Sequence, residues 1–205
     1  TVKILKSPEV AKAALIGFSN IEDAGRCVSE IIAKGIIPAG MEIMDKALTK
    51  ATNDYCKAGY PVDAEAMMIV ELDGTESEVN ELINRVEEIA KKNKCSSVKI
   101  SKSNEERLKF WAGRKAAFPA CGDLAPDYMC MDGSIPKGKL AEVLKAIQKM
   151  SEKYQLPVAN AFHAGDGNLH PLIMFNANDP EQMRKTEEFG SEILKYCVKV
   201  GGALT

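Results

Sequence analysis

The stretch that organises this chain is Ala161-Phe162-His163-Ala164-Gly165-Asp166-Gly167-Asn168-Leu169-His170-Pro171, which contains both of its histidines. Residues 165–168 have the composition of a tight chain reversal, and apolar runs flank them over 157–162 and 169–175. These features predict a β-hairpin in which His163 faces His170. Side chains directly opposite each other in a hairpin share one face of the sheet, with Cβ atoms about 4.5–5.5 Å apart.

Two imidazoles placed in this way can bind one divalent metal ion, each at roughly 2.0–2.1 Å. The alternative is that both histidines only form hydrogen bonds around the turn, and the spacing alone leaves the two interpretations open. Asp166 is a further candidate ligand. For this residue the Asx type of hydrogen bond, which shapes a turn, is the favoured interpretation.

The remaining sequence predicts an α+β fold, because strand-like and helix-like apolar patterns alternate along it. Strand–helix–strand occurs twice in the first half, which is typical of a ferredoxin-like antiparallel sheet with helices packed on one face. The second half reads strand, helix, strand, strand, helix. No low-complexity stretch or Gly/Ser linker divides the halves, so we expect one domain of two lobes. The predicted strands span 13–18, 36–44, 66–72, 97–101, 127–135, 157–162 and 169–175, and the predicted helices span 20–34, 45–57, 75–90, 103–117, 137–154 and 179–200.

Both ends of the sequence suggest a truncated polypeptide. Residues 1–12 begin without a methionine and look like the end of a strand or a linker. The second lobe needs one more strand after the helix that ends near Val200, and residues 203–205 are too short to supply it.

Composition excludes some classes of function. Lys and Arg number 27 against 29 Asp and Glu, a net charge of −2, so the basic surface of a nucleic-acid-binding protein is not expected. The six cysteines form no CxxC pair, which suggests reduced thiols in a cytoplasmic protein. The apolar runs are far shorter than the ~20 residues of a membrane-spanning helix.

Two charged residues occupy positions with apolar neighbours. Arg114 shares a helical stripe with Phe110 and Phe118, and a buried guanidinium needs an anionic partner. That partner is either a carboxylate of the protein or the carboxylate of a substrate bound in bidentate fashion. Glu42 lies inside an apolar strand, where a solvated sheet face is favoured over a metal ligand or a buried ion pair.

The chain resembles the C-terminal half of FAD-linked 2-hydroxy-acid oxidases and dehydrogenases, a group that includes the glycolate oxidase flavoprotein subunit and D-lactate dehydrogenases. The resemblance covers essentially the whole chain. It rests on three runs: His163-Ala-Gly-Asp-Gly-Asn-Leu-His170, Phe110-Trp111-Ala-Gly-Arg114-Lys115 and Tyr128-Met-Cys-Met-Asp132-Gly-Ser-Ile-Pro136.

The resemblance implies that residues 1–205 form a substrate (cap) domain over a separate FAD-binding domain of the same polypeptide. The reaction would be oxidation of a small 2-hydroxy acid, glycolate or D-lactate, to the 2-oxo acid. His163 and His170 would bind a divalent metal such as Zn or Mn, and Arg114 would bind the substrate carboxylate. Some relatives carry a Lys where this chain has Cys130, so a small acid is favoured over a dicarboxylate.

The resemblance also implies what the chain lacks. Relatives take the third metal ligand and the catalytic base from a Gly-Glu-His-Gly run beyond a double glycine, and this chain ends just before such a run. We therefore assign no catalytic residue within it, and expect weak metal binding and no turnover by the chain alone. Iron–sulfur and accessory subunits are implied partners, and peripheral attachment at the inner face of the membrane is an alternative to a freely cytoplasmic location.

Two other functions remain open. One is a non-catalytic ferredoxin-like module that binds a metal or a small molecule, since fold alone does not determine function. The other is a pure oligomerisation domain, for which the two histidines would be dispensable.

Overall fold

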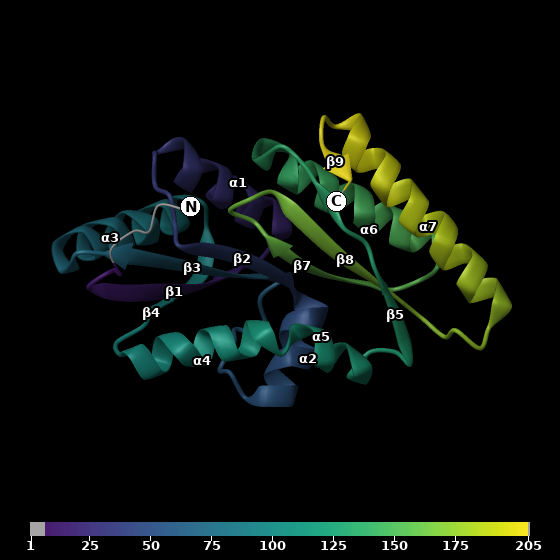
Figure 1. Cartoon of the computed structure of the whole chain (residues 1–205), viewed down its shortest axis with the longest axis horizontal. Helices are drawn as coiled ribbons and strands as arrows, with labels where there is room; N and C mark the ends of the chain where they lie inside the picture. Colours follow the sequence, from purple (N-terminus) through teal and green to yellow (C-terminus); the bar gives the residue numbers. More distant parts are fainter. Residues whose placement is uncertain (1–6, 205) are drawn as a thin grey trace, which may run out of the picture.

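The computed structural model describes residues 7–204, and Figure 1 shows their arrangement. The strands are β1 (Val10–Phe18), β2 (Gly40–Asp45), β3 (Ala66–Gly74), β4 (Cys95–Ile100), β5 (Asp127–Cys130), β6 (Gly133–Ser134), β7 (Val158–His163), β8 (Asn168–Phe175) and β9 (Ala203–Leu204). The helices are α1 (Ile21–Ala33), α2 (Lys46–Cys56), α3 (Glu76–Lys92), α4 (Asn104–Lys115), α5 (Ala117–Ala120), α6 (Leu140–Tyr154) and α7 (Pro180–Lys199), with short 3₁₀ turns η1 (Cys121–Asp123) and η2 (Lys137–Lys139).

The strands form one antiparallel sheet in the order β4-β1-β3-β2-β7-β8-β6-β9, and β5 pairs with β8 beside β6. The first four strands with α1 and α3 form one ferredoxin-like unit. The strands from β5 to β9 with α6 and α7 repeat the same order. The two units join edge to edge through β2 and β7, where Ile43 pairs with Phe162 and Met44 with Ala161. The α+β fold and the ferredoxin-like lobes predicted from the sequence are therefore confirmed.

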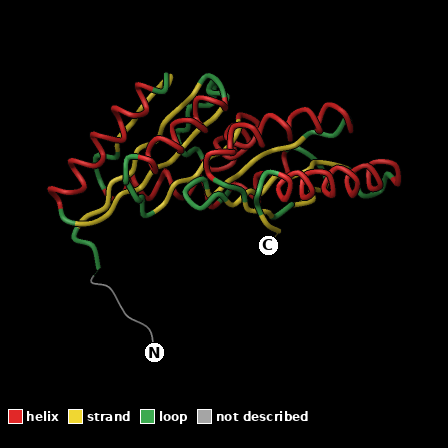
Figure 2. The backbone as a smooth tube through the Cα atoms, turned by 90° about the horizontal axis from the view of Figure 1, so that it is seen from above, coloured by secondary structure: helices red, strands yellow, loops and turns green. Residues whose placement is uncertain are grey.

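Helices cover both faces of the sheet, so the expectation of helices on one face alone is wrong (Figure 1). The helices α1, α3, α6 and α7 pack on one face and α2, α4 and α5 on the other. Central strands carry apolar side chains on both sides: Ile43 belongs to one core and Met44 to the other. Both apolar faces of the sheet have to be covered. The second face is covered by α2, which follows β2, and by α4 and α5, which follow β4. Figure 2 shows helices alongside the strands over the whole length of the sheet.

Helix starts follow the sequence closely. The Asn20 side chain accepts a hydrogen bond from the Asp23 amide at 2.8 Å, and Thr75 forms a reciprocal capping box with Glu78. Ser103 caps α4, and the Glu106 carboxylate accepts a hydrogen bond from the amide of Lys102, which precedes the cap.

The hairpin register differs from the prediction. His163 pairs with Asn168, and His170 pairs with Ala161. The turn is residues 164–167, because the amides of Asp166 and Gly167 both donate to the His163 carbonyl at 3.0 Å. Among the described residues the Asp166 side chain forms no hydrogen bond, so the expected Asx interaction is not found. Both histidines still share a face, since side chains alternate with a period of two.

The ends of the chain also differ from expectation. Ala203 and Leu204 do form a strand, paired with Ser134 and Gly133 of β6. The first strand begins at Val10, inside the segment interpreted as the end of a strand or a linker and three residues before the predicted start at Ala13. Residues 1–6 and Thr205 lie outside the described part. None of the helices described has both the length and the apolar character needed to cross a bilayer.

Candidate metal and anion site

Four chemically active side chains converge on the sheet face covered by α2, α4 and α5. Glu42 lies on β2, His163 ends β7, His170 lies on β8, and Arg114 lies near the end of α4. The junction between the two units brings the first two together. The register that pairs Ile43 with Phe162 places Glu42 opposite His163 at the next position.

Glu42 is the centre of this cluster. Its Oε1 lies 2.7 Å from Nδ1 of His163. Its Oε2 lies 3.1 Å from both Nε and Nη2 of Arg114. Glu42 and Arg114 are each 8% exposed, so a buried carboxylate meets a guanidinium that is always charged. The favoured interpretation of Glu42 as part of a solvated face is therefore wrong, because α4 covers this part of the sheet.

The two histidines contact each other directly. Their ring centroids are 5.1 Å apart and their planes are perpendicular. The predicted meeting of the two rings is confirmed, although they meet diagonally across the hairpin and not directly opposite each other. His163 remains 44% exposed at its side chain, whereas His170 is 14% exposed.

His170 also faces a carboxylate. Its Nδ1 lies 3.8 Å from Oδ1 of Asp132, in the segment between β5 and β6. That oxygen is buried and has no hydrogen-bond partner among the described residues. Burial lowers the pKa of His170 below its usual value, with the Asp132 charge opposing the shift, so the neutral imidazole is favoured.

These contacts suit a metal ion only in part. Each histidine turns Nδ1 towards a carboxylate, which leaves Nε2 of both rings as the donor atoms. Metal-bound histidines commonly hold a carboxylate on the second nitrogen in this way. However, no cluster of three or more His, Cys, Asp or Glu suited to a metal ion occurs in residues 7–204. The two imidazoles are therefore candidate metal donors, and the described residues do not complete a metal site around them.

The sequence left two anionic partners possible for Arg114, a carboxylate of the protein or that of a substrate. The structure shows an ion pair with a carboxylate of the protein, Glu42. Within the described part of the chain, Nε and Nη2 are engaged by Glu42 and no acceptor contacts Nη1. A guanidinium has five N–H donors, so the donors on Nη1 are not used by an acceptor within the described residues.

A second ion pair on α4 was not predicted from the sequence. Nη1 of Arg107 lies 2.7 Å from Oε2 of Glu71, which also accepts from Trp111 Nε1 at 2.5 Å. Arg107 precedes Arg114 by two helical turns, and Glu71 faces the same side of β3 as Ile69. The seven-residue spacing of two arginines was the available signal.

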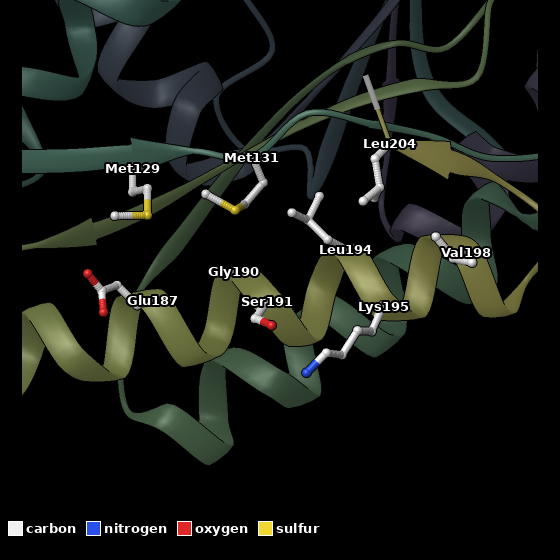
Figure 3. Close-up of a pocket in the computed structure, with 9 residues that line it drawn as sticks. All are labelled: Met129, Met131, Glu187, Gly190, Ser191, Leu194, Lys195, Val198 and Leu204. Carbon is white, nitrogen blue, oxygen red and sulfur yellow. The ribbon is translucent and has the colours of Figure 1, made fainter.

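A cleft of about 470 Å³ opens beside the cluster and includes Glu42, His163, Gly165, Asp166 and Lys137 in its wall. A larger groove of about 590 Å³ lies elsewhere, between β5 and α7. In Figure 3, Met129 and Met131 extend towards α7, from which Leu194 points back. None of the four site residues lines this groove, so it is separate from the cluster.

Known sequences similar to this chain include glycolate oxidase subunits and D-lactate dehydrogenases. The chain is 51% identical over its whole length to glycolate oxidase subunit GlcD of Escherichia coli strain K12, and 33% identical to the subunit of the same name in Bacillus subtilis strain 168. It is 28% identical to the mitochondrial D-lactate dehydrogenase [cytochrome] of Arabidopsis thaliana. The chain spans 41%, 43% and 36% of these relatives, respectively.

Solved structures share the fold at lower identity. p-Cresol methylhydroxylase with substrate bound matches 96% of the chain and 45% of its own length, with a TM-score of 0.71 at 14% identity. Alkyldihydroxyacetonephosphate synthase matches 97% of the chain and 40% of its own length, with a TM-score of 0.66 at 15% identity. The family described as FAD linked oxidases, C-terminal domain, matches residues 7–205. Because this match spans nearly the entire sequence, the chain belongs to the family of FAD linked oxidase C-terminal domains.

Proposed function

We propose that this chain is the substrate domain of an FAD-dependent oxidoreductase that converts a small 2-hydroxy acid, glycolate or D-lactate, into the 2-oxo acid. The observation that carries the proposal is the cluster of His163, His170, Glu42 and Arg114, in which two imidazoles lie beside a guanidinium. Such a set suits a substrate with adjacent hydroxyl and carboxylate groups. The names of the relatives support this substrate class.

The residues of this chain would bind and orient the acid. Nε2 of His163 and of His170 would hold a divalent ion such as Zn or Mn, which when bound polarises the substrate hydroxyl and lowers its pKa. The free edge of Arg114 would neutralise the substrate carboxylate. Binding the hydroxyl and the carboxylate of the substrate at the same time would orient its C2–H bond. Such orientation of a reacting bond lowers the barrier to reaction.

The oxidation itself needs groups outside these residues. FAD, which an FAD-binding domain of the same polypeptide would hold, would supply the acceptor for the hydride from C2. A base would take the hydroxyl proton, and no residue of this chain is assigned that role. Iron–sulfur and accessory subunits would carry the electrons onward. The six cysteines are free thiols, which supports a cytoplasmic location.

Flavin absorbance in the full-length protein tests this proposal. Glycolate or D-lactate should bleach the oxidised flavin, and prior chelation should slow the bleaching strongly. His163→Ala and His170→Ala should each have the effect of chelation. Reduction at an unchanged rate in both variants would rule out the metal site, and no reduction by any 2-hydroxy acid would rule out the substrate class.

A further inference from the structure

We propose that Glu42 is a positioning residue that fixes the metal-binding nitrogen of His163 and ties it to the anion-binding Arg114. The inference deepens the function proposed above and rests on it. The two oxygens of Glu42 serve different partners: Oε1 contacts His163 and Oε2 contacts Arg114. One side chain therefore sets the distance between the histidine and the arginine.

The contact with His163 determines the tautomer of its ring. An ionised carboxylate only accepts hydrogen bonds, and a neutral imidazole has one donor nitrogen and one acceptor nitrogen. Because Nδ1 of His163 lies 2.7 Å from Oε1, Nδ1 must carry the hydrogen. The lone pair is then on Nε2, the nitrogen available to a metal ion shared with His170.

The contact with Arg114 balances charge. A guanidinium near the two imidazoles would repel a divalent cation, and because Arg114 is buried this repulsion is weakly screened. Glu42 is buried and pairs directly with Arg114. Its negative charge offsets the guanidinium and lets a cation and an anion-binding group occupy the same small site.

A purely structural role for Glu42 is the competing explanation, and Glu71 provides the comparison. Glu71 is also a largely covered carboxylate on this face, and it also binds an α4 arginine. Its other partner is Trp111 rather than a histidine. Glu71 thus holds α4 against the sheet without contacting either imidazole.

The experiment is Glu42→Gln, with Glu71→Gln as the matched control. Arg114 offers only donors, so in Glu42→Gln the new amide oxygen stays with Arg114 and the amide NH₂ turns to His163. That NH₂ needs an acceptor at Nδ1, and the hydrogen of His163 moves to Nε2. The predicted result is a change from the Nδ1–H to the Nε2–H tautomer in Glu42→Gln and no change in Glu71→Gln.

Ring ¹⁵N shifts of metal-free protein report the tautomer, and the sequence has only two histidines to assign. Zn²⁺ is titrated to millimolar concentration and followed by the same ring shifts. These shifts report zinc bound at the histidines and not zinc bound at cysteines. Zn²⁺ affinity should fall about 10–100-fold in Glu42→Gln, as for other outer-shell carboxylates, and stay within about threefold in Glu71→Gln. Urea unfolding of both variants shows that each is folded.

An Nε2–H tautomer in the unmodified protein would overturn the role of Glu42, as would equal Zn²⁺ affinity and an unchanged tautomer in Glu42→Gln. Absence of any zinc-induced ring shift in the unmodified protein would instead overturn the proposed metal site. The tautomer measurement still decides the role of Glu42 in that case, so the two failures are distinguishable.

Discussion

Glu42 on β2 and Glu71 on β3 face the same side of the sheet, and each binds one arginine of α4. Glu42 pairs with Arg114 and Glu71 with Arg107. The two arginines are seven residues apart, so the ion pairs hold α4 against the sheet at points two turns apart. Of these two carboxylates, Glu42 is the one that also contacts a histidine.

Removing the Glu71 carboxylate should destabilise the fold. Glu71→Ala leaves the guanidinium of Arg107 and the indole N–H of Trp111 without their shared acceptor, and both are largely covered. We expect a loss of roughly 2–3 kcal/mol in the free energy of unfolding, measured in urea. Glu65→Ala, which breaks an exposed pair with Lys46, should cost less than about 1 kcal/mol. Equal losses would contradict this account of α4.

Asp132 should support His170 more weakly than Glu42 supports His163. The 3.8 Å between Oδ1 of Asp132 and Nδ1 of His170 is too long for a hydrogen bond, and the Asp132 side chain is 45% exposed. Asp132→Asn should therefore weaken Zn²⁺ binding, but by less than the roughly 10–100-fold typical of a full outer-shell contact. Zinc titration followed by the His170 ring shifts measures it. A loss larger than that of Glu42→Gln would reverse the ranking.

The two turn glycines should respond differently to substitution. Gly167 has a φ of +80°, and a Cβ there would collide with the Ile135 carbonyl. At Gly165 the nearest atom to a Cβ would be Cβ of Met41 at 3.4 Å, an ordinary contact. Gly167→Ala should cost at least about 1 kcal/mol and shift both histidine ring resonances. Gly165→Ala should be nearly neutral, and urea unfolding with ¹⁵N spectra compares the two.

Acid should destabilise the metal-free protein partly through His170. Burial lowers the pKa of this imidazole below the usual value of about 6.5. Below that pH the unfolded chain takes up a proton that the folded state resists, so stability falls as pH falls. Chelator-treated protein should lose more stability between pH 7.5 and pH 5 than the His170→Gln variant does. If urea unfolding shows the same loss of unfolding free energy between the two pH values in both proteins, His170 is not the group responsible.

The local features of this protein follow directly from its amino-acid sequence. Asn20, Thr75 and Ser103 start their helices through side-chain contacts with the next turn. The shared face of His163 and His170 also follows from strand alternation within one hairpin, and it survived an error in register. Such features depend on residues close together in the chain, so their pattern can be read directly.

The assembly of the site, by contrast, depends on contacts between distant parts of the chain. Glu42 is 121 residues from His163 and 72 residues from Arg114 in the sequence. Their contacts require two ferredoxin-like units to join at β2 and β7, and α4 to cross the second face of the sheet. No local periodicity encodes that junction. The residues around Glu42 in its apolar strand therefore carry no signal that α4 covers it.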